Sequence, residues 1–252
     1  QSFDDFQNNK HGFKIEIQKL IRNWSINLVD TIITPSEHLK NFISKLGKNN
    51  KIIKINNGIE ITEIRKESLN KSDINLVIVS RLVIQKNINI VIEALKILNN
   101  KNLKLNIIGQ GGEYGKLKEL IKKLDLQNEI KLLGKIENNK ISEFLNTSDI
   151  FIQASNYEGL PHSILEAINY EVPILSTEVG GCKDLLNNGE QGFIISSPPD
   201  KNSIAENITY IINNKEAARK KATNAKAFIK KEYNFSKQAD LYMKIFKESM
   251  NI

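Results

Sequence analysis

The fold is decided by residues 153–181, which read QASNYEGLPHSILEAINYEVPILSTEVGG. An apolar run at residues 150–152 leads into this stretch and predicts a buried parallel strand. After a loop that carries Glu158, Pro161 suits the first position of a helix, because its missing N–H would have no partner there. Residues 172–175 then predict a second short strand. The stretch therefore predicts a strand, a loop, a helix and a strand.

The start of this helix has a predictable chemistry. A helix that begins just after a strand points free backbone N–H groups and its positive dipole end above the sheet. Such a helix start binds anions, most often phosphate. Glu158 precedes the helix, and Glu166 lies about one turn inside it on a polar side. A phosphate flanked by two carboxylates that can accept hydrogen bonds from hydroxyls suggests a sugar nucleotide.

Glu158 and Glu166, with seven residues between them, resemble the E-x7-E motif of family 4 retaining glycosyltransferases of the GT-B fold. The surrounding residues of the motif match as well: Ser155, Tyr157, Gly159, Leu160, Pro161, Ala167, Pro173, Gly180 and Gly181. Two carboxylates at this spacing are often solvated surface, but the whole constellation is far more specific. The resemblance implies that Glu158 positions the transferred sugar and that Glu166 holds the ribose.

The same resemblance assigns the backbone N–H groups around Gly159, Leu160, Pro161 and His162 to the donor diphosphate. The His162 side chain could touch phosphate, or it could equally be a solvated helix residue. Both alternatives stay open at the level of the sequence.

Two cations follow the first strand of this domain. Residues 75–79 predict a strand covered on both faces, and Ser80, Arg81 and then Lys86 come after it. The pattern resembles the G-R-L-x-x-x-K pattern of the family, with Ser80 in place of the commoner glycine. Two fixed cations at the carboxyl end of a strand can neutralise a leaving pyrophosphate. The resemblance makes Arg81 and Lys86 catalytic candidates beside Glu158, although isolated cations at such a turn are often ordinary surface.

A glycine turn follows the next strand. A dinucleotide fingerprint would need glycine at 109, 111 and 114, but Tyr114 occupies the third position, which excludes an NAD site. The resemblance implies that Gly109 and Gly111 line the donor cleft and that the backbone near Gly134 meets the nucleobase. Backbone recognition leaves no side-chain signature, so the donor is expected to be UDP- or GDP-linked without a choice between them.

Composition excludes several classes of function. The chain has 252 residues, a net charge of +7 and 40% hydrophobic residues, and no apolar run approaches the length of a membrane helix. The single cysteine, Cys182, excludes an internal disulfide and is expected to be a small buried thiol. No carboxylate cluster of the Asp-x-Asp kind appears, so we expect neither a metal nor a cofactor besides the nucleotide-sugar substrate. No nucleic-acid motif is present.

The C-terminal part of the chain is basic, and two interpretations of this charge remain open. Residues 216–252 hold nine Lys/Arg against four Asp/Glu, which favours either a solvated face or peripheral contact with an anionic membrane. We expect a cytoplasmic protein, with the inner face of the membrane as the surface for any such contact.

Strands alternate with helices along most of the chain, which predicts an α/β fold with a Rossmann-like parallel sheet and helices on both faces. Residues 1–60 resemble the C-terminal remnant of an acceptor-binding domain and its hinge, so we expect a fragment or a truncated gene. Residues 61–235 are predicted to form the donor-binding domain, and residues 236–252 a helix that crosses back towards the N-terminal domain. His11 has no strand before it and receives no catalytic role.

The sequence thus predicts transfer of a sugar, with retention, from a nucleotide-diphosphate sugar to a glycan or lipid-linked acceptor, in surface polysaccharide or lipopolysaccharide synthesis. The alternative is a truncated, non-catalytic remnant that only binds nucleotide sugars. A third hypothesis is a regulatory Rossmann-like protein that binds another phosphorylated ligand, and such a protein would be indifferent to Glu166→Ala.

Overall fold

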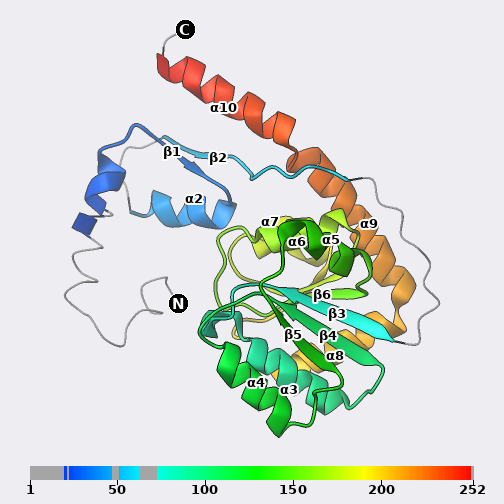
Figure 1. The fold of residues 1–252 in the computed structure, drawn as a ribbon. Helices are drawn as coiled ribbons and strands as arrows, with labels where there is room; N and C mark the ends of the chain where they lie inside the picture. The colour runs from blue at the N-terminus through cyan, green and yellow to red at the C-terminus, as the bar shows by residue number, and fades with distance from the viewer. Residues whose placement is uncertain (1–19, 22, 47–50, 63–72, 251–252) are drawn as a thin grey trace.

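The computed structural model describes residues 20–21, 23–46, 51–62 and 73–250 (Figure 1). The chain is helical at residues 20–21 and 23–27. His11 and residues 63–72, near the start of the predicted donor-binding domain, lie outside the described residues.

The larger sheet has six parallel strands in the order β5-β4-β3-β6-β7-β8. Its strands are β3 (Ile74–Val79), β4 (Leu103–Ile108), β5 (Ile130–Gly134), β6 (Ile150–Gln153), β7 (Ile174–Thr177) and β8 (Phe193–Ile195). β3 and β6 match the strands predicted at 75–79 and 150–152 to within one residue at each end, whereas β7 begins and ends two residues later than the strand predicted at 172–175. The chain runs outward from β3 to β5 and then returns to place β6 on the other side of β3, with Leu76 opposite Ile150. Open α/β sheets bind ligands at such a reversal of strand order, beyond the carboxyl ends of the strands.

Helices cover both faces of this sheet, as predicted (Figure 1). One face packs against α3 (Ile88–Leu98), α4 (Tyr114–Lys123) and α8 (Lys201–Asn213). The other packs against α5 (Asn138–Asn146), α6 (His162–Asn169), α7 (Cys182–Leu185) and α9 (Lys215–Glu232). Successive strand residues point to opposite faces, so Leu76 enters the first core and Val77 the second. The near-continuous apolar run of β3 follows from this double burial.

A smaller unit precedes the sheet. Its two strands, β1 (Thr31–Thr34) and β2 (Lys51–Lys54), pair in parallel, and α2 (Glu37–Ser44) connects them. Ser36 caps α2, because its side chain accepts a hydrogen bond from the Leu39 N–H at 3.3 Å.

The C-terminal helix α10 (Phe235–Met250) extends away from the larger sheet past β1 and β2 (Figure 1). An ion pair of 2.8 Å between Lys51 and Glu248 joins α10 to β2. The apolar side of α10 remains open, since Leu241 is 38% and Phe246 57% exposed. Within the described residues, no helix combines the length and the apolar character that crossing a bilayer requires.

Candidate functional site

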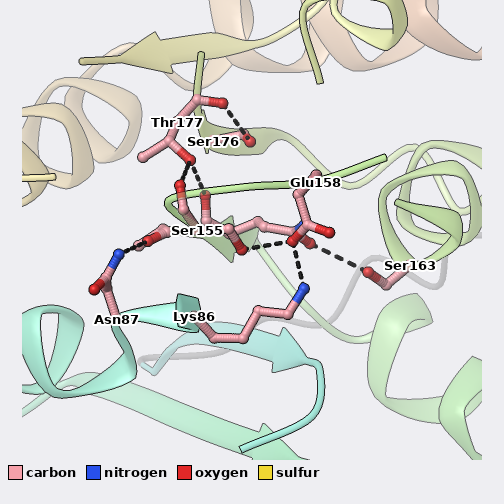
Figure 2. A network of polar contacts seen from close by, with 9 residues as sticks. Lys86, Asn87, Ser155, Glu158, Ser163, Ser176 and Thr177 are labelled. Carbon is pink, nitrogen blue, oxygen red and sulfur yellow. Dashed lines mark hydrogen bonds and ion pairs between the residues drawn. The ribbon is translucent and has the colours of Figure 1, made fainter. Parts of the chain in front are cut away.

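The loops that follow β3 and β6 meet at the reversal of strand order. After β3 the chain passes Arg81 and a short 3₁₀ helix, η2 (Ile84–Lys86), before α3 begins. Asn87, between η2 and α3, adopts the left-handed conformation at φ 48°. Its side-chain amide donates hydrogen bonds to the Ala154 carbonyl at 2.8 Å and to Asn156 Oδ1 at 2.7 Å. Asn87 thereby fastens the two loops to each other (Figure 2).

Glu158 occupies the centre of this junction and is 9% exposed. Its Oε1 accepts hydrogen bonds from Lys86 Nζ, from Gln153 Nε2 and from Ser155 Oγ, the last at 2.6 Å (Figure 2). Burial of a carboxylate is costly without such donors, so their convergence on Oε1 compensates the charge. No hydrogen bond or ion pair between described residues uses Oε2. Glu158 is therefore anchored through one oxygen and can accept a hydrogen bond from a ligand through the other.

Two glycines let the loop after β7 press against the Glu158 loop. Gly180 has φ +49°, and a Cβ there would lie 1.7 Å from the Glu158 carbonyl oxygen. Gly181 donates its N–H to the Gly159 carbonyl at 2.8 Å, and a Cβ on Gly181 would lie 2.4 Å from that oxygen. Only glycine permits backbones to approach this closely. The loop therefore supports the backbone that carries Glu158.

Helix α6 begins at His162, and Pro161 is its N-cap with φ −77° and ψ 107°. The helix thus starts one residue later than Pro161, the first helical position that the sequence predicts. Its N-terminus has no side-chain cap, and no hydrogen bond between described residues uses the N–H of Gly159, Leu160, His162 or Ser163. Free donors at a helix start are suited to binding an anion.

His162 is exposed and lies against the segment that follows β2. Its Nε2 lies 2.8 Å from Asn57 Nδ2, within hydrogen-bond distance. The structure therefore pairs His162 with Asn57, a contact that links the segment after β2 to the start of α6. Its imidazole is not a free phosphate ligand in this arrangement.

Arg81 and Glu166 are the predicted site residues whose charged groups remain unpaired among the described residues. Arg81 is exposed and makes no ion pair there, unlike Lys86, which is bound to Glu158. The Glu166 carboxylate is half-buried on α6, and burial raises its pKa above the ordinary value of 4.5. Among the described residues, these predicted site residues thus comprise one cation without an ion pair, one cation shared with Glu158 and one carboxylate whose pKa is raised by burial.

The predicted cleft glycines gather at the same edge of the sheet. Gly109 has φ +141°, and a Cβ there would lie 1.8 Å from the Ser80 carbonyl oxygen. A Cβ on Gly111 would lie 2.2 Å from the Leu82 carbonyl oxygen, so the turn after β4 presses against the turn after β3. Gly109 also donates its N–H to the Gly134 carbonyl at 2.7 Å.

The sequence analysis did not identify three polar residues that lie beneath this edge of the sheet: Asn87, Gln153 and Ser163.

Cys182 is fully buried below the site, and burial raises the pKa of its thiol to about 12. The thiol is protonated at neutral pH and unsuited to nucleophilic attack, which confirms the expected buried cysteine.

Among the residues that the structure describes, no group of three or more His, Cys, Asp or Glu side chains could hold a metal ion.

Residues 60–228 match the family model of glycosyl transferases group 1. The chain belongs to this family. Among related group 1 sequences, it is 30% identical over 260 residues to the capsular polysaccharide biosynthesis glycosyltransferase CapM of Staphylococcus aureus, covering 94% of this chain and 68% of CapM.

Solved structures show the same fold as this group 1 glycosyl transferase chain. Sucrose-phosphate synthase of Thermosynechococcus elongatus matches with a TM-score of 0.88 at 16% identity, covering 98% of this chain and 65% of the synthase. HepE of Anabaena, in complex with UDP-glucose, matches with a TM-score of 0.81 at 20% identity, covering 94% of this chain and 68% of HepE. The predicted GT-B type of α/β fold is confirmed. The chain spans between 55% and 68% of the length of three curated relatives.

Proposed function

We propose that this chain is the donor-binding part of a family 4 retaining glycosyltransferase that uses a UDP- or GDP-linked sugar. The observation that carries the proposal is the junction of Lys86 and Glu158 at the reversal of strand order. Arg81, whose guanidinium makes no ion pair among the described residues, follows β3, and the uncapped start of α6 and then Glu166 follow Glu158 along the chain. The combination offers positive charge for a diphosphate and carboxylates for hydroxyl groups.

The diphosphate is assigned to Arg81 and to the free N–H groups at the start of α6. A guanidinium can donate two parallel hydrogen bonds to phosphate oxygens, and the helix dipole adds positive potential. Lys86 shares its charge between Glu158 and the diphosphate. As the bond between the anomeric carbon and the diphosphate breaks, negative charge builds on the leaving oxygen, and these donors stabilise it. The anomeric carbon bonds to the acceptor hydroxyl oxygen, and the proton of that hydroxyl leaves with the diphosphate.

The hydroxyl groups of the donor are assigned to the two carboxylates. Glu158 Oε2, held next to the cations, accepts from the transferred sugar, whereas Glu166, one turn inside α6, accepts from the ribose. The E-x7-E spacing supports retention of anomeric configuration, because that motif belongs to retaining enzymes in the family that the sequence resembles.

The biological setting is a proposal of the same kind. A relative named for capsular polysaccharide biosynthesis supports a glycan or lipid-linked acceptor in surface polysaccharide or lipopolysaccharide synthesis. The crystal structure of HepE with UDP-glucose supports a nucleotide-sugar donor. We place the protein in the cytoplasm, with its basic C-terminal region as the surface for peripheral contact with an anionic membrane.

Calorimetric titration with UDP, GDP and ADP and with their common sugar conjugates tests this proposal. Arg81→Ala is expected to weaken nucleoside diphosphate binding by about 10- to 100-fold, because charge-assisted hydrogen bonds contribute about 1.5–3 kcal/mol. Arg219→Ala, at an exposed position on α9, is the matched control and should bind as the wild type does. A folded chain that binds no nucleotide, or one that binds equally well without Arg81, would contradict the proposed donor site.

A further inference from the structure

Gln153 is a buried polar residue at the end of an apolar strand. It follows Ile150, Phe151 and Ile152 on β6 and is only 4% exposed. A buried amide is costly unless both of its ends are hydrogen-bonded. Gln153 meets this condition, because its Nε2 donates to Glu158 Oε1 and its Oε1 accepts from Ser163 Oγ at 3.2 Å.

The chemistry of the partners fixes the orientation of this amide. An ionised carboxylate can only accept, so the amide nitrogen must face Glu158 and the amide oxygen must face Ser163. Ser163 is the second residue of α6 and contributes one of the free N–H groups of the anion site. Gln153 therefore connects the carboxylate of the site to the helix start of the site through one rigid, buried side chain.

The other two donors to Glu158 do not make this connection. Lys86 comes from η2 beside β3, and Ser155 lies on the same loop as Glu158, only three residues away. Neither contacts α6 through a hydrogen bond between described residues. Without Gln153, Glu158 would retain its charge partner but lose its fixed position relative to the start of α6.

We propose that Gln153 is a positioning residue that holds Glu158 Oε2 towards the transferred sugar and sets its place relative to the diphosphate site at α6. This inference rests on the proposed donor function and goes beyond it, because Gln153 is only 4% exposed and acts through its hydrogen bonds to Glu158 and Ser163. This role affects the binding of the two parts of the donor differently. Binding of the sugar depends on the orientation of Glu158, whereas binding of the nucleoside diphosphate depends on Arg81, Lys86, Glu166 and the α6 N–H groups.

The test compares the affinities for a nucleoside diphosphate and for its sugar conjugate, using the pair that binds the wild-type chain. Gln153→Met keeps the length of the side chain and removes both hydrogen bonds, and Ser163→Ala removes only the bond on the helix side. Gln191→Met is the matched control, since Gln191 is also buried, at 8% exposure, but lies in the loop before β8. Thermal unfolding of each variant accompanies the titrations.

Gln153→Met is expected to lower the ratio of the two affinities by about 10-fold and Ser163→Ala by about 3-fold, the range of a lost hydrogen bond. Gln191→Met should leave the ratio unchanged. A fall of both affinities by the same factor, or an unchanged ratio in a folded Gln153→Met chain, would overturn the inference and leave the proposed function intact. If Gln153→Met does not fold, Ser163→Ala decides in the same way. A wild-type chain that binds neither ligand would overturn the proposed function and this inference together.

Discussion

Lys86 Nζ and Glu158 Oε1 form an ion pair that joins the loop after β3 to the loop after β6, 72 residues apart in the chain. The two side chains are only 12% and 11% exposed. When one partner of such a pair is removed, the other charge remains in poorly solvated surroundings, which costs more than the pair itself contributes. The pair therefore matters for stability as well as for the chemistry of the site.

Lys86→Met is expected to destabilise the fold by about 3 kcal/mol, because it leaves the Glu158 carboxylate buried without its cation. Urea unfolding followed by circular dichroism measures this loss. The matched control is Lys116→Met, whose pair with Glu113 is largely exposed and should contribute less than about 1 kcal/mol. Equal losses in the two variants would show that the Lys86 pair is a surface contact.

The half-buried Glu166 predicts a dependence of stability on pH. Burial raises its pKa in the folded chain above 4.5, so the folded state binds more protons than the unfolded state between that value and the raised pKa. The free energy of unfolding contributed by this group therefore falls as the pH rises through this window and is level above it. Glu166→Gln removes the fall, whereas Glu119→Gln, an exposed residue on α4, should keep the wild-type profile. Identical pH profiles for wild type and Glu166→Gln would contradict the burial.

Gly180→Ala should displace the backbone of Glu158. The added Cβ would lie 1.7 Å from the Glu158 carbonyl oxygen, and φ is +49° at this position. We expect a loss of about 1–3 kcal/mol from backbone strain, together with weaker donor binding. Gly112→Ala is the control, because a Cβ there meets no atom within 4 Å. A Gly180→Ala chain with wild-type melting temperature and donor affinity would refute the close approach of the two loops.

The reactivity of the Cys182 thiol measures how often the fold opens beneath the site. Its thiol is fully buried, with a pKa raised to about 12, so an aromatic disulfide reagent should react with it only when the fold opens. The chain has one cysteine, so the absorbance of the released thiolate follows this residue alone. Labelling should be complete and fast in denaturant, slow in buffer, and slower still with bound nucleoside diphosphate. Rapid labelling in buffer would contradict the buried position.

The sequence predicted most of the larger sheet, because apolar runs of β-branched residues between turn residues are a local signal. The strands and the position of Glu158, Arg81 and Glu166 at one edge follow from such runs and from the rule for parallel sheets. The start of α6 was predicted one residue too early. Proline is compatible with both the N-cap and the first helical position, and only ψ separates the two.

The polar contacts beneath the site could not be predicted in the same way. Asn87 meets Ala154 across 67 residues, and Asn57 meets His162 across 105 residues. Neither pair has a spacing or composition that marks it in the sequence. Gln153 carries the one local signal that was missed, since a glutamine at the end of an apolar strand needs a buried partner.

The most direct test of the central claim is to locate bound nucleoside diphosphate on the chain by the changes in its backbone amide NMR resonances. The account predicts that the largest changes occur at the N–H groups of Gly159, Leu160, His162 and Ser163 and at Arg81. Leu103 and Ile130, at the amino ends of β4 and β5, should not respond. Changes that gather at the amino ends of the strands, with none at the start of α6, would contradict a donor site between β3 and β6.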